Sequence, residues 1–132
     1  MPLAPLTTLR VGGVASSFRE VTSEAEFIEA VVRADERGEP LLLIAGGSNL
    51  VIADEGFDGL TVHIATEGIE VQSPVAVDDE QTLVRVAAGH NWDRFVAQVV
   101  SDGYSGIETL SGIPGSVGAT PVQNVGAYGN EV

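Results

Sequence analysis

The first half of the chain contains one helical hydrophobic pattern with short apolar runs around it. In the helical segment, apolar side chains recur at three- and four-residue spacing: Ala25, Phe27, Ile28, Val31, Val32 and Ala34. Ser23 and Glu26 form a capping box at the start of this segment. Gly38 and Pro40 end it. The pattern predicts an amphipathic helix whose apolar stripe lies in the core.

The apolar runs on either side of this helix predict strands. Residues 18–21 form a candidate strand, and residues 1–10 are expected to be extended because two prolines prevent an early helix. Leu41–Ile44 is a continuous apolar run, typical of a strand buried on both faces. Residues 60–64 are expected to form the next strand, after a turn at residues 56–59.

The second half has the pattern of short strands followed by a second helix. Ile69–Gln72, residues 75–77 and residues 82–86 are candidate strands, with an exposed hairpin tip at residues 78–80. Asn91 is expected to cap a helix that Gly103 ends. The predicted apolar stripe of this helix comprises Trp92, Phe95, Val96, Val99 and Val100.

The change of pattern near residues 65–69 divides the chain into two lobes. We predict a β-α-β lobe over residues 1–66 and a strand-rich lobe over residues 67–132. Hydrophobic residues make up 44% of the chain and aromatic residues only 5%, so the core is expected to be mostly aliphatic.

The charge of the chain excludes several classes of partner. Nineteen acidic residues against six basic ones give a net charge of −13, which is unsuited to a nucleic-acid or anionic-lipid surface. No apolar run reaches membrane-spanning length, and the first residues lack the regions of a signal peptide, so we expect a cytoplasmic protein. The absence of cysteine excludes disulfides and thiolate metal sites.

Two glycine-rich stretches are the candidate binding elements. Residues 45–49 directly follow the Leu41–Ile44 run, and seven of the 16 glycines lie between residues 103 and 129. Free amides on a rigid glycine-lined wall suit a phosphate or a flat aromatic ring, although plain turns between buried elements remain the alternative. Neither a dinucleotide fingerprint nor a Walker lysine is present. An anionic ligand therefore requires amides and a few arginines: Arg10, Arg19, Arg33, Arg85 and Arg94.

The residues alone assign no catalytic or metal site. His63 alternates with apolar residues in a predicted strand, which favours a structural role. His90 stands at a helix start, a better place for a functional side chain, but the two histidines lack metal-site spacing. Glu108 is either an acid–base group or a carboxylate satisfied by neighbouring loop amides. This reasoning leads to a binder of an extended, phosphate-bearing ligand.

Five motifs, in order, resemble one enzyme family. They are Thr7-Thr-Leu-Arg-Val-Gly-Gly13, Ala45-Gly-Gly-Ser-Asn-Leu50, Ala88-Gly-His-Asn-Trp92, Gly106-Ile-Glu108 and Ser111-Gly-Ile-Pro-Gly-Ser-Val-Gly-Ala-Thr-Pro-Val-Gln-Asn-Val-Gly-Ala-Tyr-Gly129. Together they closely resemble the UDP-N-acetylenolpyruvoylglucosamine reductase (UDP-N-acetylmuramate dehydrogenase) family of bacterial peptidoglycan synthesis. The resemblance covers nearly the whole chain, and the last motif is the most specific.

The resemblance implies the α+β fold class, as a two-lobed FAD-binding domain of the vanillyl-alcohol-oxidase (PCMH) type with non-covalent FAD between the lobes. It also implies NADPH as the reductant of FAD and a UDP-sugar as substrate. In the family, amides of the first turn and of the 113–118 loop hold the FAD diphosphate, and later residues continue along the flavin. The implied cofactor residues are Gly46, Gly47, Ser48, Asn49, Gly112, Pro114, Gly115, Gly118, Ala119, Gln123, Asn124, Gly126 and Tyr128.

The family's catalytic arginine, serine and glutamate have no counterpart here. They lie beyond Gly129 in the family, whereas this sequence ends at Val132. We therefore assign no catalytic residue, and expect the chain to be an N-terminal FAD-binding part that is truncated in its second lobe, lacks the substrate domain and is inactive alone. The alternatives are a non-enzymatic flavin- or nucleotide-binding remnant, or another flavoenzyme of the superfamily. The oligomeric state and the preference for NADPH over NADH are not readable.

Overall fold

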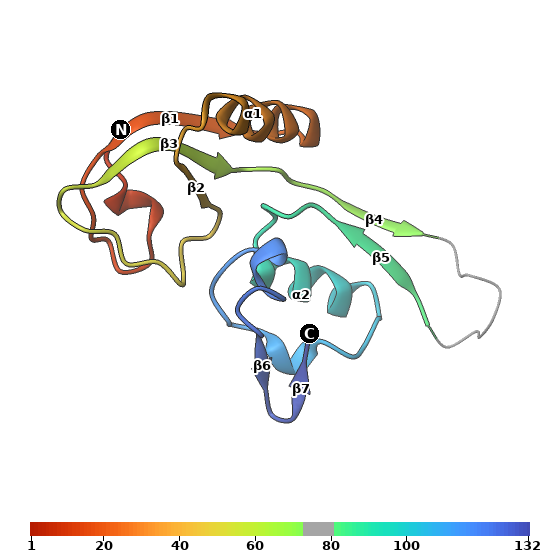
Figure 1. Cartoon of the computed structure of the whole chain (residues 1–132). Helices are drawn as coiled ribbons and strands as arrows, with labels where there is room; N and C mark the ends of the chain where they lie inside the picture. Colours follow the sequence, from red (N-terminus) through yellow and green to blue (C-terminus); the bar gives the residue numbers. More distant parts are fainter. Residues whose placement is uncertain (73–80) are drawn as a thin grey trace. The chain divides into compact units, whose positions relative to one another are not determined.

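The computed structural model describes residues 1–72 and 81–132. They form two compact units, Met1–Thr66 and Glu67–Val132 (Figure 1). Both units contain helices and strands, so the predicted α+β class is confirmed. The strand predicted at residues 75–77 and the tip predicted at residues 78–80 lie outside the described residues.

The first unit is a parallel three-stranded sheet with one crossover helix. Strand β1 (Ala15–Val21) leads into helix α1 (Glu24–Arg37), which is followed by β2 (Leu41–Ile44) and β3 (Phe57–Ile64). The strand order is β1-β3-β2, and both pairings are parallel. The predicted β-α-β order is therefore present. Strands β1 and β3 both begin earlier than their sequence patterns indicate.

Helix α1 begins and ends where the sequence predicts. The Ser23 hydroxyl accepts a hydrogen bond from the Glu26 amide, and the Glu26 carboxylate accepts one from the Ser23 amide. Gly38 ends the helix in the left-handed conformation, with a φ of 59°. The predicted apolar stripe is only partly correct, because Ala30 and Ala34 are the residues that the helix buries. Three stripe residues are exposed on another face: Ala25, Ile28 and Val32.

Two further predictions for this unit are wrong. Strand β2 is not buried on both faces, because it lies at the edge of the sheet, and Leu43 is 42% exposed. Residues 1–10 are not uniformly extended, because Ala4–Leu6 forms a short 3₁₀ helix. Pro5 is compatible with that helix, since the first residues of a helix need no amide donor.

The second unit combines a hairpin, a helix and a long glycine-rich segment. Strands β4 (Ile69–Gln72) and β5 (Leu83–Val86) pair antiparallel, and helix α2 (Trp92–Ser101) follows. The chain then forms two 3₁₀ turns before the short antiparallel pair β6 (Gly126–Ala127) and β7 (Asn130–Glu131). The positions predicted for β4, β5 and α2 are therefore correct to within one or two residues.

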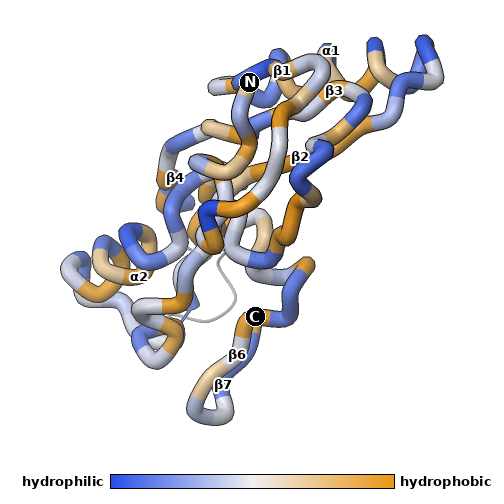
Figure 2. Tube along the Cα trace, turned by 90° about the vertical axis from the view of Figure 1, so that its left-hand side faces the viewer, coloured by the Kyte–Doolittle hydropathy of each residue, from blue (hydrophilic) through white to orange (hydrophobic). Residues whose placement is uncertain are grey.

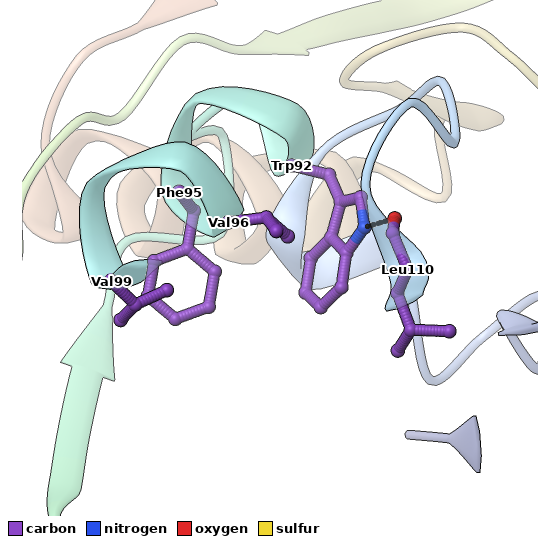
Figure 3. Packing of buried hydrophobic residues seen from close by; sticks show 5 residues of the cluster. All are labelled: Trp92, Phe95, Val96, Val99 and Leu110. Atoms are coloured by element: carbon purple, nitrogen blue, oxygen red, sulfur yellow. Dashed lines mark hydrogen bonds between the residues drawn. The ribbon is translucent and has the colours of Figure 1, made fainter. Parts of the chain in front are cut away.

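Helix α2 carries the core of the second unit. Asn91 caps the helix by accepting a hydrogen bond from the Arg94 amide at 2.9 Å. Along α2 in Figure 2, hydrophilic and hydrophobic residues alternate as an amphipathic helix requires. Figure 3 shows the buried cluster: Trp92, Phe95, Val96, Val99 and Leu110. The predicted stripe is wrong only at Val100, which is exposed.

Candidate functional site

The first glycine-rich turn, residues 46–49, follows β2 and lies against the N-terminal segment. The Thr8 amide donates a 3.0 Å hydrogen bond to the Gly47 carbonyl. A Cβ atom at Gly47 would lie only 1.9 Å from the Leu6 carbonyl oxygen, and the φ of Gly47 is +61°. Only glycine fits this close approach. The turn is therefore held against residues 6–8 by backbone contacts.

The four amides of this turn have no internal partner. Among residues 1–72 and 81–132, the amide groups of residues 46–49 donate no hydrogen bond, and neither do the side chains of Ser48 and Asn49. Consecutive unpaired amides in a turn form a concavity that binds an anion. The turn therefore has the donors that a phosphate group requires.

The second glycine-rich stretch lies against the segment that leads into α2. Asn91 and Ser116 form an antiparallel bridge at its centre. Three amide-to-carbonyl hydrogen bonds of 2.8–3.1 Å join the two segments: Trp92 to Gly115, Val117 to His90 and Gly118 to Ala88. A Cβ atom at Gly118 would lie 2.6 Å from the Ala88 Cβ. As in the first turn, a glycine permits two backbones to approach closely.

Two carboxylates fix the loop that precedes this bridge. Asp93, in the first turn of α2, accepts hydrogen bonds from the Gly112 amide at 2.7 Å and from the Ser111 hydroxyl at 3.0 Å. Glu108 accepts a hydrogen bond from the Gly106 amide at 2.5 Å. Backbone amides of Glu108 itself and of Gly106 lower the pKa of the Glu108 carboxyl. Of the two interpretations of Glu108, the geometry supports the carboxylate satisfied by loop amides.

These contacts show which amides of the second glycine-rich stretch already donate a hydrogen bond and which do not. The amides of Gly112, Gly118 and Ala119 all donate within the unit, to Asp93, Ala88 and Ser116 respectively. In the described part of the chain, three amides of the loop donate to no other group: Ile113, Gly115 and Ser116. Residues 113–116 therefore contain the available donors, and Gly118 contributes space instead of an amide.

Two buried polar atoms next to these donors also lack a partner. Ser116 is 1% exposed, yet its hydroxyl makes no hydrogen bond with any described residue. The Nδ1 atom of His90 is likewise buried without a described partner. Buried polar atoms are normally satisfied, so unpaired ones indicate a missing ligand or water. Sequence reasoning placed His90 at a favourable position but did not single out Ser116.

The remaining predicted cofactor residues lie in the last turns of the second unit. The Gln123 amide donates to the Ala119 carbonyl at 3.0 Å, and Asn124 has a positive φ of 48°. Gly126 begins β6. Tyr128 stands in the two-residue turn between β6 and β7, where its φ is 55° and that of Gly129 is 83°. The Tyr128 side chain is 91% exposed.

The structure assigns His63 a structural setting. Its Nδ1 atom lies 2.9 Å from the Glu20 carboxylate, across the β1–β3 pairing. Its ring stacks with Phe18 at a centroid distance of 6.5 Å.

Residues 1–72 and 81–132 contain no cluster of three histidine or acidic side chains that would hold a metal ion. No helix in those same ranges has the length and hydropathy to cross a membrane.

Comparison with known protein families identifies the family of the chain. A family model described as an FAD binding domain matches residues 15–132. The chain belongs to this FAD binding domain family. The unpaired amides of each glycine-rich segment fit a phosphate group such as those of FAD, and in the second segment the buried Ser116 hydroxyl lies beside them.

Similar proteins carry the name expected from the motifs. A UDP-N-acetylenolpyruvoylglucosamine reductase of Streptomyces coelicolor is 55% identical over 131 residues, covering 99% of this chain and 32% of the relative. One from Thermobifida fusca is 52% identical and covers 100% of this chain and 36% of the relative. The crystal structure of the Thermus caldophilus enzyme matches with a TM-score of 0.72 at 29% identity, covering 99% of this chain and 43% of that chain.

These comparisons confirm the resemblance and the predicted type of fold. The chain spans about a third of the length of the curated relatives it matches. Its similarity to them extends over the whole described sequence, including both glycine-rich stretches.

Proposed function

We propose that this chain is the FAD-binding part of a UDP-N-acetylenolpyruvoylglucosamine reductase, which uses NADPH and reduces a UDP-sugar to UDP-N-acetylmuramate. The observation that carries the proposal is the pair of glycine-rich segments whose amides remain unpaired. Both segments lie in a chain that is 55% identical to a relative of that name over 131 residues. These substrates would place the reaction in the cytoplasm.

The proposed binding mode follows from the available donors. In the first unit, the amides of residues 46–49 would bind a phosphate group of FAD. In the second unit, the amides of Ile113, Gly115 and Ser116 would do the same. Gln123, Asn124 and Gly126 would line the flavin. A neutral amide cradle suits a chain with a net charge of −13, because it binds an anion without requiring many cations.

The chain's own residues would position and shield the cofactor. When bound, FAD would supply the hydride chemistry between NADPH and the enolpyruvyl double bond. Asp93 would orient the loop amides through Gly112 and Ser111. The exposed Tyr128 is proposed to lie on the substrate and nicotinamide side of the flavin. We assign no residue of this chain a catalytic role.

The test uses the protein expressed from its complete reading frame. We expect it to purify with FAD, identified by chromatography after acid release. We also expect NADPH oxidation that depends on the enolpyruvyl substrate, with UDP-N-acetylmuramate detected by mass spectrometry. Bound FAD without product would instead favour the non-enzymatic flavin-binding alternative. A protein that neither retains nor rebinds FAD would overturn both interpretations.

A further inference from the structure

Arg10 has an unusual backbone conformation next to the first glycine-rich turn. Its φ is 57°, in the left-handed region that L-residues other than asparagine and aspartate rarely occupy. That conformation is strained for a residue that carries a Cβ atom. In the described part of the chain, only two other non-glycine residues share a positive φ, Asn124 and Tyr128, and both are predicted cofactor residues. Such strain persists where the surrounding structure enforces it, often at ligand sites.

Hydrogen bonds fix Arg10 beside the turn. The Arg10 amide donates to the Thr7 carbonyl at 3.2 Å, and the Thr7 hydroxyl donates to the Val11 carbonyl at 3.2 Å. Thr8 in turn donates to Gly47. Two residues of extended chain span at most about 7 Å, so the Arg10 backbone stays within that distance of Thr8. An arginine side chain can therefore reach the amides of residues 46–49.

The other arginines of the first unit already have favourable electrostatic interactions, whereas Arg10 is available to bind an anion. Arg19 and Arg33 both pair with Glu29 at 2.7 Å. Arg37 lies in the last turn of α1, where a cation is favoured by the helix dipole. Arg10 is exposed and makes no ion pair with any described residue. Arg10 is therefore an unpaired cation beside a turn whose amides can bind an anion.

We infer that Arg10 and the amides of residues 46–49 form a single diphosphate site. The arginine supplies the positive charge, and the amides supply hydrogen bonds that orient the phosphate groups. The inference rests on the proposed binding of FAD. A guanidinium pairs with phosphate oxygens through two parallel hydrogen bonds, which lysine cannot reproduce. The strained backbone at Arg10 is then explained by the need to direct this side chain toward the turn.

The test compares Arg10→Gly with Arg37→Gln in the protein expressed from its complete reading frame and stripped of flavin. Both variants remove one positive charge from the first unit, and glycine also relieves the strain at position 10. For Arg10→Gly we expect the dissociation constant of FAD to rise about tenfold, as for the loss of one charge-assisted contact. The salt dependence of FAD binding should also weaken, because one ion pair is lost. Arg37→Gln should bind FAD within about twofold of the parent.

The melting temperature of the flavin-free protein separates binding from folding. It should be unchanged or higher in Arg10→Gly. FAD affinity within twofold of the parent, with unchanged salt dependence, would overturn the inference. An equal loss of FAD affinity in Arg10→Gly and in Arg37→Gln would also overturn the inference. Failure of the parent protein to bind FAD would instead overturn the proposed function.

Discussion

Asp93 and Gly112 are joined by a 2.7 Å hydrogen bond from the Gly112 amide to the Asp93 carboxylate, although 19 residues separate them. The bond connects the first turn of α2 to the second glycine-rich stretch. Because the same oxygen accepts the Ser111 hydroxyl, one side chain fixes two consecutive residues of the loop. The helix therefore serves as the rigid support from which the predicted binding loop extends.

Replacing Asp93 should loosen this loop. Asp93→Ala removes a charged acceptor of two hydrogen bonds, and we expect a loss of about 1 kcal/mol in the free energy of unfolding. FAD should also dissociate faster, because the loop amides lose their orientation. Urea unfolding and flavin release measure the two effects. Asp35→Ala, which removes an equal charge from the surface of α1, is the control and should change neither; an equal effect there would refute the role given to Asp93.

A side chain at position 118 should destabilise the second unit. Gly118→Ala places a methyl group 2.6 Å from the Ala88 Cβ, and overpacking of this kind costs about 1–3 kcal/mol. Adding Ala88→Gly should recover part of the loss, since the nearest clashing atom is then removed. Thermal unfolding of the single and double variants checks this coupling. Strictly additive effects of the two changes would contradict the predicted contact.

The capping box of α1 should contribute a pH-dependent part of the stability. Hydrogen bonds from Thr22 and Ser23 lower the pKa of the Glu26 carboxyl below its ordinary value of 4.5. The unfolded chain then binds the proton more readily than the folded chain. The contribution is therefore fully present above pH 4.5 and is lost as the pH falls through the folded pKa.

Denaturant unfolding at a series of pH values below neutrality measures this contribution. Glu26→Gln should show a shallower loss of stability in the acid range than the parent protein. Glu36→Gln is the matched control, because Glu36 accepts no side-chain hydrogen bond from any described residue. Its stability profile should follow that of the parent. Parallel profiles for Glu26→Gln and the parent would show that the capping carboxylate has no such linkage.

Tyr128 should matter for function and not for folding. Asparagine is favoured in the left-handed conformation of a two-residue hairpin turn, so Tyr128→Asn should leave stability unchanged or raise it by up to about 1 kcal/mol. Flavin reduction by NADPH should slow in the same variant of the complete protein. Stopped-flow absorbance and thermal unfolding give the two readouts. A marked loss of stability would identify Tyr128 as a structural residue.

The local signals in the sequence predicted the helices well but not which of their faces are covered. The capping box at Ser23 and the glycine at position 38 set the ends of α1 by interactions within a few residues. By contrast, Ile28 and Val32 are exposed because the sheet packs against the alanine face. Leu43 is exposed because β3 lies between β1 and β2. Strand order depends on long-range pairing, which hydrophobic periodicity does not encode.

The same distinction applies to the candidate site. Glycine content located both candidate binding segments, and the motifs indicated which residues to consider. The availability of an amide, however, is decided by partners far along the chain. Gly118 donates to Ala88 and Gly112 donates to Asp93, and no spacing rule predicts either bond. The assignment of individual cofactor contacts stays a prediction.

The close approaches at Gly47 and Gly118 have a consequence for the kinetics of ligand binding. Each turn rests on the backbone of another segment, so its conformational entropy is lost when the protein folds and not when the cofactor arrives. The cradles are preorganised, and association should be limited by diffusion and orientation instead of by loop closure. The amides that anchor these turns, those of Thr8 and Gly118, should therefore be protected from hydrogen exchange even before flavin is added.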